Sequence, residues 1–141
     1  MSQVNPRPLN ILLVEDDEVD VMNVRRAFRQ FHIMNPLFVA SDGVEALSML
    51  RGGEVPSERR LVLLDLNMPR MNGIELLREL RSDASLHTTP VVVLTTSDDE
   101  RDKIEAYNLH VAGYLVKPVT FASFCDLMVT LSKYWMLVEL L

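Results

Sequence analysis

Cysteine is nearly absent from this sequence, because Cys125 is the only one among 141 residues. A single cysteine excludes an internal disulfide framework and a cysteine metal site within the chain. Long apolar runs are missing as well: none reaches the roughly 18 residues that a membrane span needs. Residues 1–9 lack the apolar core of a signal peptide. These absences predict a soluble, cytoplasmic protein that has no membrane partner.

The sequence also lacks an excess of basic side chains. Its 20 acidic and 14 basic residues give a net charge of −6, whereas nonspecific binding of nucleic acid needs a basic footprint. The three histidines, His32, His87 and His110, do not have the spacing of metal ligands. The length and the 48% hydrophobic content suit one domain with one core. We therefore expect a single domain with no nucleic-acid partner.

Short apolar runs alternate five times with amphipathic segments. The runs predict strands at residues 9–14, 37–40, 61–64, 91–94 and 113–116. The segments predict helices at residues 17–31, 42–51, 73–81, 98–109 and 121–135. Strands that alternate with helices are typical of βαβ units and a parallel sheet. The expected fold class is α/β, a flavodoxin-like (βα)5 doubly wound sheet of order 2-1-3-4-5 with helices on both faces.

The helical periodicity also predicts which side chains are buried. The first helix carries a stripe of Val21, Val24, Phe28 and Phe31, so these should face the core. In the helix at residues 98–109, the buried candidates are Ile104, Ala106 and Tyr107. Asp17 and Asp42 are expected to cap the first two helices at their N-termini.

Three acidic side chains and one lysine directly follow predicted strands. Glu15 and Asp16 come after the first strand, Asp65 after the third and Lys117 after the fifth. The carboxyl ends of parallel strands meet at one edge of a sheet, so we expect these side chains to converge. A carboxylate cluster beside an ammonium group suits a hard divalent cation, Mg²⁺ or Mn²⁺, and a phosphoryl group.

The chemistry of such a site assigns a role to each residue type. The carboxylate of Asp65 can attack phosphorus and form an aspartyl phosphate. Glu15 and Asp16 can hold the cation, with a backbone carbonyl near Asn67 completing the ligands. Alone, each residue is weak evidence, since an aspartate after a strand is usually a cap. A lysine before proline is ordinarily a surface charge. Their joint occurrence at strand ends favours a site.

Four motifs make the sequence resemble the receiver domain of two-component response regulators, over about residues 8 to 135. They are residues 13–17, residues 64–69 with Gly73, residues 94–97 and residues 113–118. The resemblance implies that Asp65 is the phosphoacceptor and Asp16 the main metal ligand, with Glu15 reaching the metal through water. Asp65 itself and the backbone carbonyl of Asn67 are expected as further metal ligands, and Lys117 is expected to bind the phosphoryl group.

The resemblance also implies a switch. A histidine kinase would donate its phosphoryl group to Asp65, Thr95 would move toward it, and Tyr114 would rotate into the vacated space. The face formed by the fourth helix, fifth strand and fifth helix would then change shape. The peptide bond between Lys117 and Pro118 is expected to be cis. Three positions depart from the common family pattern: Glu15 for aspartate, Thr96 for alanine, and Val119 for an aromatic residue.

Residues 1–7 are expected to form a flexible N-terminus, and residues 136–141 an apolar C-terminal tail. No second domain is expected to follow, so the receiver would act alone through protein contact. The segment from Tyr134 to Leu141 either packs as a last helical turn on its own core or forms a self-association surface. We expect a homodimer through this tail and the face described above. A narrower similarity to single-domain regulators of bacterial phytochrome kinases implies such a kinase as the partner.

Other functions remain open from the residues alone. A phosphatase of the haloacid-dehalogenase type also uses an aspartate at a strand end, but it needs a second acid two residues later. That position is Asn67, which cannot protonate a leaving group. An interaction module without phosphorylation conflicts with the intact Asp65, Asp16 and Lys117. A flavin-binding protein would suffer repulsion between its phosphate and the carboxylates. The prediction is a phosphoacceptor switch and not an enzyme.

Overall fold

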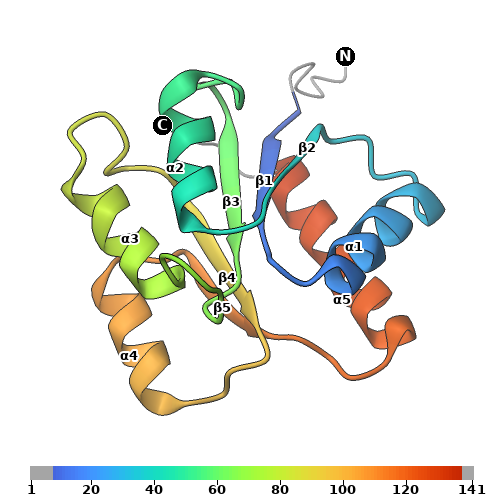
Figure 1. Ribbon diagram of the computed structural model, residues 1–141. Coiled ribbons are helices and arrows are strands. Elements are labelled where there is room, and N and C mark those ends of the chain that lie inside the picture. Colours follow the sequence, from blue (N-terminus) through green and yellow to red (C-terminus); the bar gives the residue numbers. More distant parts are fainter. Residues whose placement is uncertain (1–7, 138–141) are drawn as a thin grey trace.

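The computed structural model describes residues 8–137, and residues 1–7 and 138–141 lie outside the described part. One parallel sheet has the strand order β2-β1-β3-β4-β5 (Figure 1). The strands are β1 (Asn10–Val14), β2 (Leu37–Ala40), β3 (Arg60–Leu64), β4 (Val91–Thr95) and β5 (Gly113–Val116). The helices are α1 (Glu18–Gln30), α2 (Gly43–Gly52), α3 (Gly73–Ser82), α4 (Glu100–Asn108) and α5 (Phe121–Leu137). The predicted fold class and strand order are confirmed.

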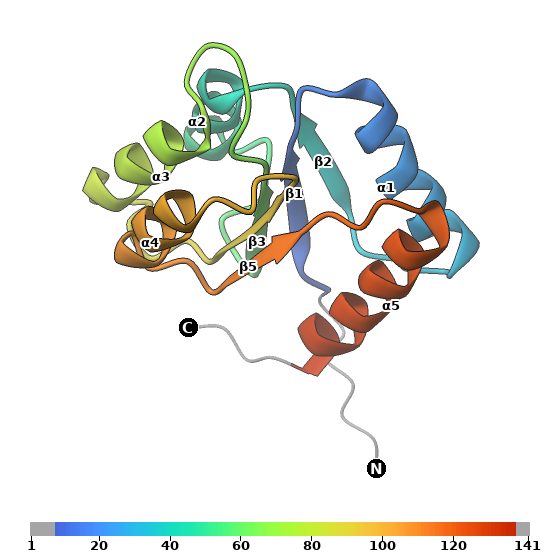
Figure 2. The ribbon, with the colours of Figure 1, turned by 90° about the horizontal axis from the view of Figure 1, so that it is seen from below.

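The sheet is covered on both faces. Helices α1 and α5 lie on one side, and α2, α3 and α4 on the other (Figure 2). Alternate side chains of β1 enter different cores: Leu12 and Val14 join the core under α2 to α4, while Ile11 and Leu13 join the core under α1 and α5. This follows from the two-residue period of a strand. Strands β3 and β4 are buried along their whole length, as central strands between two helical layers should be.

Polar caps begin the helices at the carboxyl edge of the sheet. The carboxylate of Asp17 accepts a hydrogen bond from the Val19 amide at 2.8 Å, and that of Asp42 from the Glu45 amide at 2.9 Å. Both predicted caps are confirmed. Asn72 and Glu75 form a reciprocal capping box at the start of α3. Asp17 and Asp42 lie within three residues of the preceding strand, whereas Asn72 ends a longer loop that carries Asp65 and Asn67.

Three predictions about the helices and the backbone are wrong. In α4, only Ala106 of the expected set is buried, since Ile104 is 58% exposed and Tyr107 is 53% exposed. Helix α4 lies at the edge of its layer, beside α3 and β5, so that only a narrow stripe of it is covered (Figure 1). Phe31 of the α1 stripe is also exposed, because it lies at the C-cap after the last helical turn.

The expected cis bond between Lys117 and Pro118 is wrong as well, since no peptide bond between residues 8 and 137 is cis. The trans isomer is the more stable one before proline in general. Lys117 reaches the site from this backbone because its amide donates to the Thr95 carbonyl at 2.8 Å, which extends the pairing of β5 with β4.

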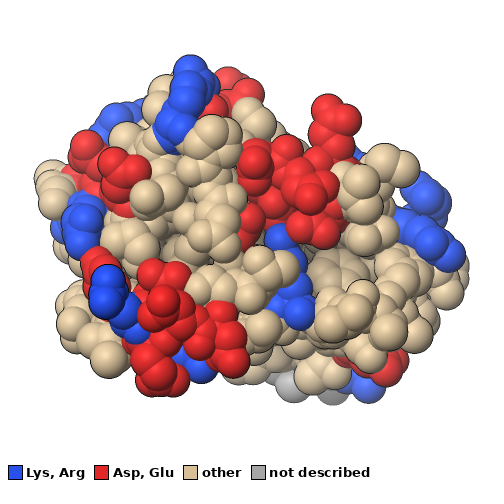
Figure 3. All heavy atoms as spheres, turned by 60° about the horizontal axis from the view of Figure 1, so that its bottom comes forward, with Lys and Arg blue, Asp and Glu red and all other residues tan. Residues whose placement is uncertain are grey.

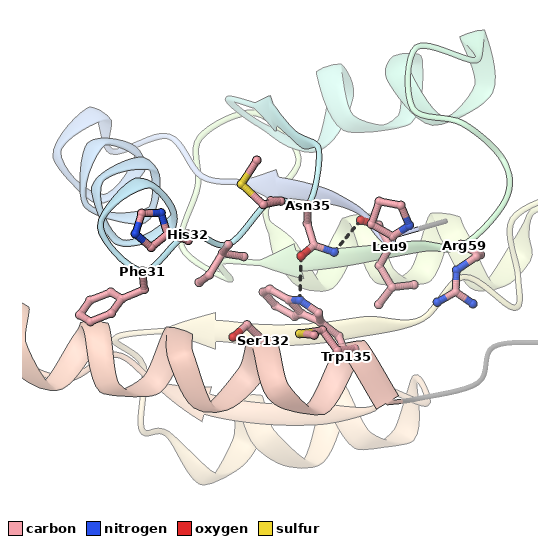
Figure 4. A pocket seen from close by; sticks show the side chains of 11 residues that line it. Leu9, Phe31, His32, Asn35, Arg59, Ser132 and Trp135 are labelled. Atoms are coloured by element: carbon pink, nitrogen blue, oxygen red, sulfur yellow. Dashed lines mark hydrogen bonds between the residues drawn. The ribbon is translucent and has the colours of Figure 1, made fainter. Parts of the chain in front are cut away.

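The last turns of α5 pack on the body of the domain. Trp135 is 1% exposed, and its ring lies 6.0 Å from that of Phe28. Its indole Nε1 donates to Asn35, whose amide donates to the Leu9 carbonyl (Figure 4). For Trp135, this confirms the alternative of a helical turn on its own core. Tyr134 remains exposed, and residues 138–141 of the predicted tail lie outside the described residues.

An apolar pocket of about 300 Å³ adjoins Trp135 (Figure 4). Its lining includes Leu9, Phe31 and Asn35, which precede β1 or β2. The pocket therefore lies at the amino ends of the strands, away from the predicted site at their carboxyl ends. Among the described residues, no helix combines the length and apolarity that a membrane crossing requires.

Candidate functional site

Three carboxylates meet at the carboxyl edge of the sheet. Glu15 and Asp16 follow β1 and Asp65 follows β3, and these strands are paired in register from end to end. One oxygen from each of the three side chains lies within 4.8 Å of the others. Glu15 and Asp65 are buried, whereas Asp16 is exposed. Figure 3 brings this edge of the molecule forward and shows acidic side chains gathered in two groups on it.

Lys117 lies among these carboxylates. Its Nζ donates to Glu15 Oε1 at 2.5 Å and to Asp20 Oδ2 at 2.7 Å, and it lies 3.9 Å from Asp65 Oδ2. Its side chain is only 9% exposed. The structure thus brings together all four charged residues predicted at the strand ends. It adds Asp20, which the sequence analysis missed because that residue lies within a helix and not at a strand end.

Burial and the neighbouring charges have opposite effects on the pKa values of Glu15 and Lys117. Burial raises the pKa of Glu15 to about 7, although the hydrogen bond and charge of Lys117 act to lower it. Burial lowers the pKa of Lys117, but hydrogen bonds to Asp20 and Glu15 outweigh it, so the net pKa is raised. Lys117 therefore stays protonated. Glu15 is held in surroundings where its negative charge is costly unless a cation compensates it.

Thr95, at the end of β4, contacts Asp65 directly. Its buried hydroxyl donates to Asp65 Oδ1 at 2.7 Å, and its oxygen accepts the Ser97 amide at 3.3 Å. Tyr114 on β5 donates its hydroxyl to the Ser97 carbonyl at 2.9 Å. Ser97 Oγ in turn donates to Asp102 of α4 at 2.6 Å. Thr95 and Tyr114 are therefore joined through Ser97, and the same residue connects them to α4.

The loop between β3 and α3 carries Asn67, whose backbone amide donates to Asp65 Oδ1 at 3.4 Å. The loop is closed by a bond from the Gly73 amide to the Leu66 carbonyl. A Cβ at position 73 would lie 2.6 Å from the Asp65 carbonyl oxygen, so only glycine fits this close approach. Asn67 itself is exposed, which leaves its position at the rim of the site accessible.

The same loop is fixed to α2 by an ion pair. Arg70 and Met71 both have left-handed backbone angles, with φ of 43° and 39°. Arg70 donates to the buried carboxylate of Asp42 at 2.7 to 2.8 Å, and the Gly43 amide donates to the Met71 carbonyl. Left-handed angles at two non-glycine residues in sequence are costly, so these contacts hold the loop in its conformation.

The donor set fits a hard divalent cation. Three carboxylates offer oxygen ligands at one edge, which is the chemistry that Mg²⁺ and Mn²⁺ prefer. Such an ion would also reduce the repulsion between Glu15 and Asp65, which acts to raise the pKa of Glu15. Thr96 and Val119, two of the departures from the family pattern, both have exposed side chains.

Three kinds of comparison with known proteins, by family model, by sequence and by structure, identify the same family. The model of the response regulator receiver domain matches residues 11–128. A probable methanogenesis regulatory protein, FilR2 of Methanothrix harundinacea, is 38% identical over 92% of this chain and 84% of its own. The response regulator Rcp1 of Synechocystis is 37% identical over 96% of this chain and 95% of its own.

Solved structures agree with these relatives. The phosphorylated cyanobacterial phytochrome response regulator RcpA superimposes with a TM-score of 0.83 at 34% identity, covering 94% of this chain and 97% of its own. The Mn²⁺-bound form of Rcp1 superimposes with a TM-score of 0.81 at 36% identity, covering 95% of this chain and 99% of its own. With this sheet order, these carboxylates and these relatives, the chain belongs to the response regulator receiver domain family of two-component signalling.

Proposed function

We propose that Asp65 accepts a phosphoryl group from a histidine kinase and that this modification switches a protein-interaction surface. The proposal is based on the surroundings of Asp65. Its buried carboxylate has the Thr95 hydroxyl at 2.7 Å and the Lys117 ammonium at 3.9 Å, and oxygens of two further carboxylates lie within 4.8 Å of one of its own. A nucleophile, a cation site and a fixed positive charge are thus all provided by one edge of the sheet.

The transfer exchanges one bond to phosphorus for another. An oxygen of Asp65 bonds to phosphorus as the bond between phosphorus and the imidazole nitrogen of the kinase breaks, and the imidazole leaves. Glu15, Asp16, Asp65 and the Asn67 carbonyl would hold Mg²⁺ or Mn²⁺, which supplies positive charge to the phosphoryl oxygens when bound. Lys117 adds a second positive charge there.

Thr95 would couple the modification to the surface. Its hydroxyl now donates to Asp65 Oδ1, and a phosphoryl group on Asp65 offers it new oxygen acceptors. A shift of Thr95 would disturb its bond with the Ser97 amide, and Ser97 also accepts from Tyr114 and donates to Asp102. Tyr114 and α4 would therefore respond together, which is a population shift between two arrangements of one face.

Substitution of Asp65 by asparagine tests the phosphoacceptor. Asparagine keeps the Oδ1 acceptor for Thr95 and nearly the same volume, so the fold should survive, but its amide is not a nucleophile toward phosphorus. After treatment with acetyl phosphate and Mg²⁺, intact mass spectrometry should show one added phosphoryl group on the parent protein and none on the variant. Circular dichroism checks the fold. Full labelling of Asp65→Asn would reject the assignment.

The adduct should be a single modification and not the start of sustained turnover. A phosphatase mechanism needs an acid two residues after the nucleophile, and the Asn67 amide cannot protonate a leaving group. We accordingly propose a phosphoacceptor switch and not an enzyme. Continuous release of product from a phosphate ester in the presence of Mg²⁺ would favour the enzyme.

A bacterial phytochrome is the proposed upstream kinase, because RcpA is named as a cyanobacterial phytochrome response regulator. We place the protein in the cytoplasm and its working form as a homodimer through the α4–β5–α5 face and the C-terminal tail. That face exposes Ile104, Tyr107, Val116 and Tyr134. Phosphotransfer profiling against the histidine kinases of the source organism would identify the partner.

A further inference from the structure

Asp20 is a fourth acidic residue at the site, and it holds Lys117. Its Oδ2 accepts from Lys117 Nζ at 2.7 Å, whereas the same ammonium lies 3.9 Å from Asp65. The Lys117 side chain is almost completely buried, and that of Asp20 is one-third exposed. In this arrangement, Lys117 is bonded to Glu15 and Asp20 and not to the residue that receives the phosphoryl group.

The start of helix α1 fixes Asp20 in this position. The carboxylate of Asp17 caps the helix by accepting from the amides of Val19 and Asp20. Asp20 therefore lies in the first turn of a capped helix, beside the end of β5 that carries Lys117. The pairing of α1 and α5 on the same face of the sheet keeps the helix in place (Figure 2).

We propose that Asp20 is a positioning residue that keeps Lys117 away from Asp65 and thereby slows phosphorylation. The inference rests on the proposed function of Asp65. Lys117 must approach the incoming phosphoryl oxygens, so its bond to Asp20 has to lengthen or break during the transfer. A contact that is stronger before the reaction than in the transition state raises the barrier. The carboxylate of Asp20 also repels the negatively charged phosphoryl donor, and this repulsion raises the barrier to transfer as well.

The helix offers a matched control for the charge of Asp20. Glu18 lies in the same first turn of α1, two residues earlier, and is exposed. It forms no ion pair with the described residues. Glu18→Gln therefore removes the same charge at the same helix terminus without changing any contact of Lys117. Asp20→Asn removes the charge and weakens the contact, while Asp20→Glu keeps both with a longer side chain.

The experiment measures the rate of phosphorylation of the full chain by acetyl phosphate and Mg²⁺. Relative to Glu18→Gln, Asp20→Asn should be faster by about two- to fivefold, the range that corresponds to a partly exposed ion pair. Asp20→Glu should return the rate to that of the parent protein, which a loss of helix stability alone would not do. Thermal melts check that all variants are folded.

The outcomes separate the two proposals. If the parent protein is not labelled at Asp65, the proposed function fails. If the parent protein is labelled but Asp20→Asn reacts no faster than Glu18→Gln, or reacts more slowly, the function stands and the role of Asp20 is overturned. A crystal structure of Asp20→Asn gives a second measurement, since Lys117 Nζ should then lie closer to Asp65 than 3.9 Å.

Discussion

At the scale of single residues, the site depends on buried charges whose partners come from distant parts of the chain. Lys117 joins β5 to the ends of β1 and α1, and Thr95 joins β4 to the end of β3. A buried charge without such a partner would be strongly destabilising. The same contacts that balance the charges also place them for chemistry, so stability and reactivity of this edge depend on the same few side chains.

Asp42 should make stability depend on pH. Its hydrogen bond from the Glu45 amide lowers its pKa, against the opposing effect of burial, and Arg70 lowers it further. A folded-state pKa below the unfolded value of about 3.9 gives stability that is present above that value. This stability is lost as the pH falls through the folded pKa. Urea unfolding should show Asp42→Asn to be less stable than the parent protein at pH 7, by a margin that shrinks by pH 3.

Asp126→Asn is the control for this pH effect. Asp126 is exposed on α5, and its side chain forms no ion pair with the described residues. The margin between this variant and the parent protein should stay small at both pH values. A margin for Asp42→Asn that is constant or that grows toward low pH would contradict the assignment.

At the scale of elements, the loop between β3 and α3 determines where Asp65 and Asn67 lie. It is closed at one end by the approach of Gly73 to the Asp65 carbonyl and fixed at its middle to α2 by Arg70. The first contact is made by backbone atoms, so a flexible side chain cannot relieve it, and in the second contact the carboxylate of Asp42 is buried. These contacts constrain the loop, in which the backbone amide of Asn67 donates to Asp65 Oδ1 at 3.4 Å.

Gly73→Ala tests this constraint. The new Cβ would meet backbone atoms of Asp65 and Leu66 at 2.6 and 2.7 Å, so the loop must shift. We expect a loss of about 1–3 kcal/mol in the free energy of unfolding, as for other overpacked sites. Weaker Mn²⁺ binding should accompany it. Denaturant titration and electron paramagnetic resonance of Mn²⁺ measure the two effects.

Gly52→Ala is the matched control, since a Cβ there meets nothing within 4 Å and the residue is helical. It should gain up to about 1 kcal/mol from the better helix propensity of alanine and leave Mn²⁺ binding unchanged. If Gly73→Ala and Gly52→Ala had equal effects on the free energy of unfolding and on Mn²⁺ binding, the close approach at Gly73 would not constrain the loop.

At the scale of the whole molecule, the α4–β5–α5 face combines exposed apolar side chains with a connection to the site. Ile104 and Tyr107 lie one turn apart on α4, and Tyr114 on β5 donates its hydroxyl to the Ser97 carbonyl. The proposed dimer would use this face. Truncation of the tail has to spare Trp135, because that residue belongs to the core of the domain.

Two acidic substitutions test the dimer. Ile104→Glu with Tyr107→Glu would place charges on the proposed interface, so light scattering should show a lower average mass than for the parent protein. Met22→Glu is the control: Met22 is 66% exposed on α1, away from the proposed interface, and its replacement should leave the mass unchanged. An equal mass for all three proteins would count against this face.

Much of the fold follows from local patterns. Short apolar runs and the caps Asp17 and Asp42 predict the strands and helices to within a few residues. The order of the strands was taken from the flavodoxin-like fold, which five alternating strands and helices suit. The burial of α4 was predicted wrongly, because a helical pattern does not indicate that a helix lies at the edge of its layer. Ile104 and Tyr107 are exposed for that reason.

The sequence by itself determined that Glu15, Asp16, Asp65 and Lys117 meet, because parallel strands all end at one edge. Only the tertiary structure decided which of them Lys117 touches. The bonds of Lys117 to Asp20, of Arg70 to Asp42 and of Tyr114 to Ser97 join residues from different elements. Such contacts depend on the distances between packed helices and loops, and no local periodicity in the chain encodes them.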